Sequence, residues 1–179
     1  LATTDILTRA YNRMHFERVL NSEIDRAIRH GGHFCIIYFD VDHFKEINDK
    51  HGHPVGDSVL STIAKVVHDS NRSPDIFARV GGDEFVILST STRIEGAYNH
   101  AKRQQTNINN LNIENVGAVS CSFGIAEFIK EKDDVYSIVK AADAALYRAK
   151  KKGRDCIEMN KRETKTAENQ TGKQLDTTE

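Results

Sequence analysis

The chain has 179 residues, of which 39% are hydrophobic and 28% are charged, a composition typical of a globular domain with its own core. Its formal net charge of -1 argues against a protein that coats nucleic acid or an anionic membrane. No apolar run approaches the roughly 18 residues that a membrane span needs, and no segment resembles a signal peptide. We therefore expect one soluble domain that contacts neither nucleic acid nor membrane.

The cysteines indicate the cellular compartment of the domain, and the first residue indicates that it belongs to a longer protein. Cys35, Cys121 and Cys156 stand singly in apolar stretches, without the spacing of metal ligands, so we expect reduced thiols buried in a cytoplasmic domain. The chain begins at Leu1 without a methionine, and its first element follows within a few residues. We therefore expect a piece of a longer protein, whose sensor or regulatory domain, together with any membrane anchor, precedes this segment.

The first half of the chain alternates helical and strand patterns. Apolar residues recur at three- and four-residue spacing from Asn12 to His30, which predicts an amphipathic helix. Residues 34–41 are apolar and β-prone until Asp40, which is typical of a central strand buried on both faces. A short helical piece at 44–47 leads into a loop at 49–54, and a second amphipathic helix follows.

The second half adds the remaining strands. Residues 76–80 and 85–88 flank a glycine turn and predict a β-hairpin. Residues 92–106 have weak helical periodicity, and the Asn-rich segment 107–115 predicts a loop. The last expected elements are a strand at 116–128, a helix at 135–151 and a short edge strand at 155–158. This order predicts an α+β fold, with helices packed on a partly antiparallel sheet.

A polar segment ends the chain. Residues 159–179 contain only three apolar residues, Met159, Ala167 and Leu175, so we expect a disordered tail.

The turn of the expected hairpin reads Gly81-Gly82-Asp83-Glu84. Glycine lets a backbone turn tightly and approach a ligand, and adjacent acids can hold a divalent cation against phosphates. Taken alone, Gly-Gly-Asp is more typical of a hairpin turn with solvated acids. A second acidic cluster upstream favours the phosphate and metal site.

That second cluster is Asp40-Val41-Asp42, at the end of the expected central strand. Strand alternation points both carboxylates to the same side, so one of them can meet the hairpin acids. By itself, Asp-X-Asp is also typical of a solvated strand end. Together with Asp83 and Glu84 it indicates a magnesium site, because Mg²⁺ prefers carboxylate oxygens from two elements together with phosphate oxygens.

These residues carry a family resemblance. Residues 39–49, followed by Gly52-His53 and Gly56-Asp57, resemble the first signature of the GGDEF-domain diguanylate cyclases, and residues 81–85 match the motif that gives this family its name. Asp5-Ile6-Leu7-Thr8 with Asn12-Arg13 resembles the motif at the start of the domain, and residues 120–126 and 142–154 resemble its later signatures. The match covers residues 1–158 and departs at Arg9-Ala10, where Gly-Leu is usual, and at Asp155, where Asn is common.

The resemblance implies a fold and an activity. Members of the family have a central five-stranded sheet flanked by helices, related to nucleotidyl cyclases and to the polymerase palm. They condense two GTP molecules into cyclic di-GMP and release two pyrophosphates, with Mg²⁺ as the cofactor and Mn²⁺ as an alternative. Because one nucleotide must attack the other in line, the resemblance implies an antiparallel homodimer of GTP-loaded domains.

The resemblance also assigns roles to single residues. Asp40 and the Val41 carbonyl would bind the metal, Asp83 would activate the ribose 3′-hydroxyl and touch metal, and Glu84 would complete the metal shell. Asn48 and Asp57 would read the guanine edge, since an amide and an acid suit its O6 acceptor and its N1 and N2 donors. The substrate-binding positions are Phe44, Lys45, Asn48, His53, Asp57, Gly81, Gly82, Lys150 and Arg154. His53, beside Pro54, is interpreted as a residue that orders its loop.

Two further pairs of residues complete the expectation. Lys150 and Arg154 would hold the terminal phosphates, although alone they are typical of a solvated helix end whose cations complement the helix dipole. Arg72 and Asp75 stand just upstream of the hairpin and resemble the family's inhibitory site for product, with Arg103 as a further contributor. An exposed turn with a weak ion pair is the alternative for this tetrapeptide.

Two other functions stay open at this point. One is a catalytically silent module that binds GTP or cyclic di-GMP and signals by interaction, which the intact set of acids disfavours. The other is a cyclase with a different product, such as a mixed GMP–AMP dinucleotide, which Asp57 at the guanine-reading position disfavours.

Overall fold

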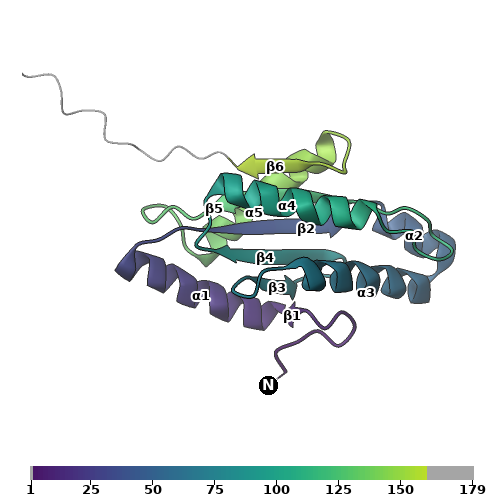
Figure 1. Cartoon of the computed structure of the whole chain (residues 1–179), viewed down its shortest axis with the longest axis horizontal. Coiled ribbons are helices and arrows are strands. Elements are labelled where there is room, and N and C mark those ends of the chain that lie inside the picture. The colour runs from purple at the N-terminus through teal and green to yellow at the C-terminus, as the bar shows by residue number, and fades with distance from the viewer. Residues whose placement is uncertain (1, 161–179) are drawn as a thin grey trace, which may run out of the picture.

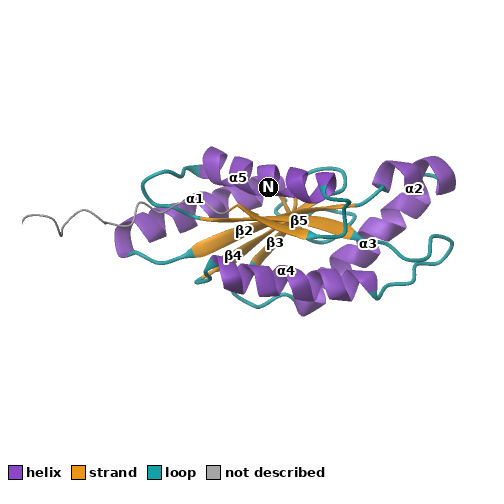
Figure 2. Cartoon of the chain, turned by 90° about the horizontal axis from the view of Figure 1, so that it is seen from above, coloured by secondary structure: helices purple, strands orange, loops and turns teal. Residues whose placement is uncertain are grey.

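The computed structural model describes residues 2–160, which form three layers. A central sheet lies between two helices on each face, with α1 and α5 on one side and α3 and α4 on the other (Figures 1 and 2). The helices are α1 (Arg13–His30), α2 (Phe44–His51), α3 (His53–Ser70), α4 (Ile94–Asn109) and α5 (Val135–Lys151). The strands are β1 (Tyr11–Asn12), β2 (Phe34–Val41), β3 (Ile76–Arg79), β4 (Glu84–Thr90), β5 (Cys121–Glu127) and β6 (Ile157–Asn160).

The sheet is mixed, with the strand order β1-β3-β4-β2-β5-β6. The four central strands are antiparallel to one another, whereas β1 pairs in parallel with β3 and β6 pairs in parallel with β5 at the two edges. The α+β prediction is therefore confirmed, with six strands where we expected five. The additional strand is the two-residue β1, which is too short to show a strand pattern in the sequence.

The central strand β2 is buried on both faces, as its continuous apolar pattern predicts. Cys35, Ile37 and Phe39 face the core beneath α3 and α4. Phe34 and Ile36 face the second core, beneath α1 and α5. Both faces are covered because the chain crosses over the sheet with helices on either side.

Phe39 lies at the centre of the first core. Its ring stacks on those of Phe77, Phe85 and Phe123, with centroids 6.3, 5.4 and 5.0 Å away. These rings come from β2, β3, β4 and β5, so one aromatic cluster connects the four central strands.

Several expected boundaries differ from the structure. The helix expected at 44–47 continues to His51, and α4 continues to Asn109, into the expected loop. The strand expected from residue 116 begins at Cys121. Met159 and Asn160, which we expected in the tail, belong to β6, where backbone pairing with β5 outweighs their local sequence. The rest of the expected tail, 161–179, lies outside the described residues.

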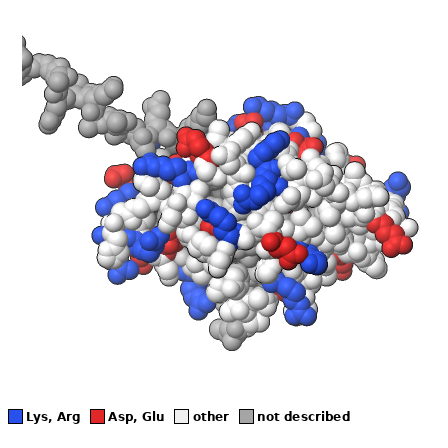
Figure 3. All heavy atoms as spheres, viewed as in Figure 1, with Lys and Arg blue, Asp and Glu red and all other residues white. Residues whose placement is uncertain are grey.

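The structure also shows how the surface charges and the three thiols are placed. Basic and acidic side chains are interspersed on the face shown in Figure 3, with no broad area of one sign. Cys35 and Cys121 are buried as expected, whereas Cys156 is half-buried. Among residues 2–160, no helix is long and apolar enough to cross a membrane.

Candidate functional site

The two acidic clusters meet at one end of the sheet. β2 and β4 pair antiparallel, and their register places Asp40 directly opposite Glu84. The hairpin of β3 and β4 carries the Gly81–Glu84 turn at its tip, as predicted. Like charges directly opposite each other destabilise a sheet unless a cation lies between them. The register therefore creates a place where a cation is favourable.

Asp40 is the most perturbed carboxyl at this end. Its side chain is buried and forms an ion pair with Lys150 of α5 through Oδ2. Burial raises the pKa of Asp40 to about 6, against the lowering effect of Lys150, and the nearby carboxylates of Asp83 and Asp42 add to the rise. Its second oxygen, Oδ1, is buried without a hydrogen-bond partner within residues 2–160.

An unpaired, buried carboxylate oxygen is costly and requires an explanation. A divalent cation between Asp40 and Glu84 would satisfy it, so these residues fit the expected Mg²⁺. Over the described part of the chain, no three His, Cys, Asp or Glu side chains are already grouped closely enough to hold an ion. The acids therefore come from adjacent elements, and a bound cation would have to draw them closer together.

The two glycines of the turn act differently from our expectation. Neither has a positive φ, so the turn does not require their left-handed freedom. A methyl group at Gly81 would overlap the Glu84 carboxylate, whereas Gly82 has open space around it. Gly81 is therefore needed to seat Glu84, and Gly82 leaves the backbone accessible to a ligand.

Arg79 holds the turn, a role that the sequence analysis missed. Its guanidinium donates to the carbonyl oxygens of Gly81 and Gly82 at 2.7–3.2 Å and to both carboxylate oxygens of Asp5 at 3.1 and 3.2 Å. Burial opposes ionisation of Asp5, but hydrogen bonds from Thr8 and Arg79 outweigh it and lower the pKa of this carboxyl. The guanidinium thus fixes the Gly81–Glu84 turn against the N-terminal loop.

Asp42 lies apart from the hairpin acids. Its Oδ1 accepts from the Ser122 hydroxyl at 2.6 Å, and its Oδ2 accepts from the Ser120 hydroxyl at 2.6 Å and from the Asp155 N–H at 3.0 Å. Of the two acids in the Asp-X-Asp motif, Asp40 therefore faces Glu84, while Asp42 has a structural role with its oxygens already satisfied.

The expected guanine-reading residues lie on two consecutive helices, Asn48 in α2 and Asp57 near the start of α3. Asn48 packs so closely against Gly56 that a methyl group there would overlap its Oδ1, and Asp57 is the next residue. The Asn48 Oδ1 is buried without a partner among the described residues, as an acceptor reserved for a ligand would be. Phe44 packs against the first core, while Lys45 and His53 are exposed.

Lys150 and the expected phosphate-binding Arg154 flank the end of α5. Lys150 contacts Asp40 directly. Arg154 follows in a tight turn, and its N–H donates to the Ala149 carbonyl at 3.1 Å. The structure thus places the cationic end of α5 beside the acidic end of β2.

Arg72 and Asp75 form a closed ion pair at the opposite end of β4. Arg72 donates from Nε and Nη2 to the two oxygens of Asp75 at 3.0 and 3.3 Å, and Asp75 also accepts from the Thr90 N–H at 3.1 Å. A cavity of about 440 Å³ borders the pair and is lined by Arg9, among others. Asp75 is fully buried, which contradicts a merely exposed turn.

Behind this pair lies a buried polar network that sequence reasoning did not find. His100 Nδ1 lies 3.0 Å from Ser89 Oγ and 3.5 Å from Asp75 Oδ2, and its Nε2 lies 3.2 Å from Gln104 Nε2. Burial, together with the positive charge of Arg103 on the same helix, lowers the pKa of His100 to about 4, against the raising effect of Asp75.

The His100 pKa predicts a pH-dependent stability. The folded-state pKa lies below the unfolded value of 6.5, so the unfolded chain binds the proton more tightly and His100 destabilises the fold as pH falls from about 6.5 to 4. Relative to His100→Asn, we expect the wild type to lose at most about 3 kcal/mol of stability between pH 7 and 4, as measured by urea denaturation.

The comparison with His100→Asn is necessary because Asp40 changes the pH dependence of stability in the opposite direction. Its folded-state pKa of about 6 exceeds the ordinary 3.8, so protonation of Asp40 stabilises the fold over part of the same pH range. Equal pH slopes for the wild type and His100→Asn would show that His100 titrates normally.

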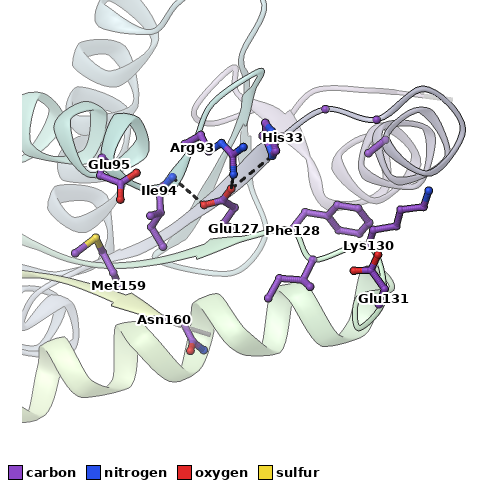
Figure 4. Close-up of a pocket in the computed structure, with 14 residues that line it drawn as sticks. His33, Arg93, Ile94, Glu95, Glu127, Phe128, Lys130, Glu131, Met159 and Asn160 are labelled. Carbon is purple, nitrogen blue, oxygen red and sulfur yellow. Dashed lines mark hydrogen bonds and ion pairs between the residues drawn. The ribbon is translucent and has the colours of Figure 1, made fainter. Parts of the chain in front are cut away.

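A further cavity, of about 840 Å³, lies at the start of β2, far along the strand from Asp40 (Figure 4). At its centre, Glu127 accepts from the Ile94 N–H at 3.0 Å and pairs with Arg93 at 3.6 Å and His33 at 3.7 Å. None of the expected site residues lines this cavity.

Comparisons with known proteins agree with the fold and the motifs. The sequence model described as "Diguanylate cyclase, GGDEF domain" matches residues 2–156. The chain is 35% identical over 161 residues to "Probable diguanylate cyclase DgcC" of Escherichia coli (strain K12), and 38% identical over 161 residues to diguanylate cyclase DgcP of Pseudomonas aeruginosa. These alignments cover 89% and 88% of this chain but 43% and 24% of those proteins, so the chain spans less than half the length of these curated relatives.

Solved structures give the same result. The GGDEF domain of DgcB from Caulobacter crescentus, in complex with c-di-GMP, has a TM-score of 0.85 and 30% identity, covering 90% of this chain and 95% of that one. Diguanylate cyclase SiaD from Pseudomonas aeruginosa, in complex with its activator SiaC, has a TM-score of 0.84 and 34% identity, covering 88% and 62%. The chain therefore belongs to the family of diguanylate cyclase GGDEF domains.

Proposed function

We propose that this chain is the catalytic domain of a diguanylate cyclase, which joins two GTP molecules into cyclic di-GMP and releases two pyrophosphates. The observation that carries the proposal is the like-charged pair of Asp40 and Glu84, beside the glycine turn and within reach of Lys150. Acids held together at a ligand-accessible turn suit metal-assisted phosphoryl chemistry. Family membership and the curated relatives support the same reaction.

Each part of the site has one task in this reaction. Asn48 and Asp57 select guanine, and Lys45, Lys150, Arg154 and the backbone near Phe44 hold the phosphates. Mg²⁺, or Mn²⁺ in its place, would be held by Asp40, the Val41 carbonyl, Asp83 and Glu84, and would neutralise phosphate charge.

Asp83 serves as the base. It accepts the proton of a ribose 3′-hydroxyl, the 3′-oxygen forms a bond to the α-phosphorus of the other GTP, and the bond from that phosphorus to pyrophosphate breaks. A single domain holds one GTP, so the two nucleotides meet only when two domains face each other antiparallel. The initial rate should therefore rise with the square of enzyme concentration wherever the monomer predominates.

A turnover assay tests the proposal. The domain is incubated with Mg²⁺ and GTP, then with GTP and ATP together, and the products are identified by mass. Cyclic di-GMP in both incubations supports the proposal. GTP binding without any product would favour a silent module, and a mixed GMP–AMP product would overturn the assigned guanine selection.

The contact of Asn48 with Gly56 predicts a specific defect in substrate binding. Gly56→Ala adds a methyl group that displaces Asn48, so we expect the KM for GTP to rise about tenfold, equivalent to about 1.4 kcal/mol. The fold should lose little stability, because the preference of a helix for alanine over glycine, roughly 1 kcal/mol, offsets part of the cost of displacing Asn48. Ser58→Ala, at an exposed position of the same helix, is the matched control. Equal KM values for the two variants would remove Asn48 from the base pocket.

Product feedback belongs to the same proposal, with Arg72, Asp75 and Arg103 as the binding residues. The solved complex of the similar DgcB domain with c-di-GMP is consistent with product binding to this kind of domain. Arginine suits this ligand because its guanidinium grips phosphate or guanine with two hydrogen bonds and stacks on bases.

Arg72→Ala is the better test of feedback than any Asp75 variant, because the buried Asp75 also accepts from the Thr90 N–H. We expect Arg72→Ala to keep the initial rate but to bind cyclic di-GMP at least tenfold more weakly, since each lost charge-assisted hydrogen bond is worth about 1.5 to 3 kcal/mol. Inhibition of the wild type should be noncompetitive with GTP. Equal product affinity by calorimetry would reduce the tetrapeptide to a structural turn.

The wider setting is also part of the proposal. The domain acts in the cytoplasm, where GTP is available, and is controlled by a sensor or regulatory domain that brings two copies together. The small share that it spans of its curated relatives is consistent with such additional domains.

A further inference from the structure

The turn after α5 has an unusual backbone. Gly153, Arg154 and Asp155 have φ angles of 116°, 66° and 43°, which places three successive residues in the left-handed region. Residues other than glycine occupy this region at an energetic cost, so contacts elsewhere must hold them there. Arg154, which we assign to the terminal phosphates of GTP, is in the middle of this turn.

Asp155 supplies those contacts. Its N–H donates to Asp42 Oδ2 at 3.0 Å, and its carbonyl accepts from Gln105 Nε2 at 2.6 Å. Its Oδ1 accepts from Gln105 Nε2 at 2.9 Å and from Asn109 Nδ2 at 3.0 Å, and its Oδ2 lies 3.2 Å from the same Asn109 nitrogen. Every polar group of Asp155 is therefore engaged, although the residue lies at the surface.

The partners of Asp155 are themselves fixed. Asp42 is buried and accepts from the hydroxyl of Ser122 on β5 and from that of Ser120, just before this strand. Gln105 is buried in α4, and its Oε1 accepts from Lys102 Nζ at 2.9 Å. The turn is thus anchored to the end of β2 and to α4, two elements that are far from it in sequence.

The side chain of Arg154, in contrast to that of Asp155, is not held by such contacts in the described part of the chain. Within residues 2–160 its guanidinium has no hydrogen-bond or ion-pair partner. One turn earlier, Lys150 contacts Asp40 at the acidic end of β2. A rigid backbone with an unpaired cation is the arrangement that a preorganised phosphate-binding residue requires.

We propose that Asp155, gripped by Asp42, Gln105 and Asn109, is a positioning residue that holds Arg154 in place for the terminal phosphates of GTP. This inference rests on the proposed function. Asn is common at this position in the family, but a carboxylate has only acceptors. In this chain α4 supplies two amide groups as the matching donors.

The test separates triphosphate binding from binding of the rest of the nucleotide. The ligands are 3′-deoxy-GTP, which lacks the attacking hydroxyl and cannot react, and GMP, which lacks the two terminal phosphates. Both are titrated calorimetrically with Mg²⁺ into the wild type and into Asp155→Gly, Asp155→Asn, Arg154→Ala and the Arg154→Ala/Asp155→Gly double variant. Glycine removes the carboxylate while tolerating the left-handed backbone, so the fold should survive.

We expect Asp155→Gly to weaken 3′-deoxy-GTP about tenfold and GMP less than twofold, equivalent to about 1.4 kcal/mol for the triphosphate alone. Asp155→Asn should stay within threefold of the wild type, because the amides of Gln105 and Asn109 can turn to match it. Arg154→Ala should weaken 3′-deoxy-GTP at least as much as Asp155→Gly does, with no further loss in the double variant.

Three results would overturn the inference. If Arg154→Ala weakens 3′-deoxy-GTP and Asp155→Gly does not, Asp155 has no positioning role, while the proposed function stands. If Asp155→Gly weakens GMP as much as 3′-deoxy-GTP, its role is general stability. If Arg154→Ala changes neither affinity, Arg154 does not hold the phosphates. Failure of the proposed function itself would instead appear as absence of cyclic di-GMP in the wild-type turnover assay.

Discussion

Asp83→Ala is expected to abolish the formation of cyclic di-GMP while leaving the domain folded. Asp83 would take the proton from the attacking 3′-hydroxyl and contact the metal, so its loss should cost about a thousandfold or more, roughly 4 kcal/mol of barrier. In residues 2–160, the Asp83 side chain makes no hydrogen bond or ion pair that its removal could break. The rate is measured by product mass with saturating GTP and Mg²⁺.

A matched control distinguishes the catalytic effect from a change in overall charge. Asp49→Ala removes an exposed carboxylate from α2 and should keep the wild-type rate. Thermal unfolding should give the same midpoint for both variants to within a few degrees, since neither breaks a side-chain contact. A rate for Asp83→Ala as high as a tenth of the wild-type rate would contradict its role as the base.

Phe39→Ala is expected to destabilise the fold by about 3 to 5 kcal/mol, the range for removing a large buried aromatic side chain. The ring is 0% exposed and stacks on Phe77, Phe85 and Phe123 from three other strands. Its removal leaves a cavity at the point where the four central strands are joined, which the surrounding backbone cannot close. Urea denaturation measures the change in the free energy of unfolding.

Phe39→Leu is the control for this prediction, because it keeps much of the volume and should cost less than half as much as Phe39→Ala. The two variants together separate the cavity from the loss of stacking, which is worth about 0.5–1.5 kcal/mol per aromatic pair. A loss below about 2 kcal/mol for Phe39→Ala would show that the core collapses around the missing ring and that the cluster does not join the strands.

Local patterns in the sequence were enough to predict the helices, the buried central strand and the hairpin. Apolar periodicity reports which face of an element is buried, and the residues of one turn are contiguous in the chain, so both are visible without tertiary structure. The family motifs extended this to candidate roles for Asp40, Asp83 and Glu84. The register of β2 with β4 then placed Asp40 and Glu84 opposite each other.

Only the tertiary structure decided how these groups are held. The ion pair of Arg79 with Asp5 joins residues 74 positions apart, and the hydrogen bond from the Asp155 N–H to Asp42 spans 113 positions. The sequence also left open which acid of Asp40 and Asp42 would face the hairpin, since alternation assigns both to one side. Contacts between such distant residues leave no periodic pattern in the sequence. A buried polar group needs only one complementary atom, and the fold alone determines which residue supplies that atom.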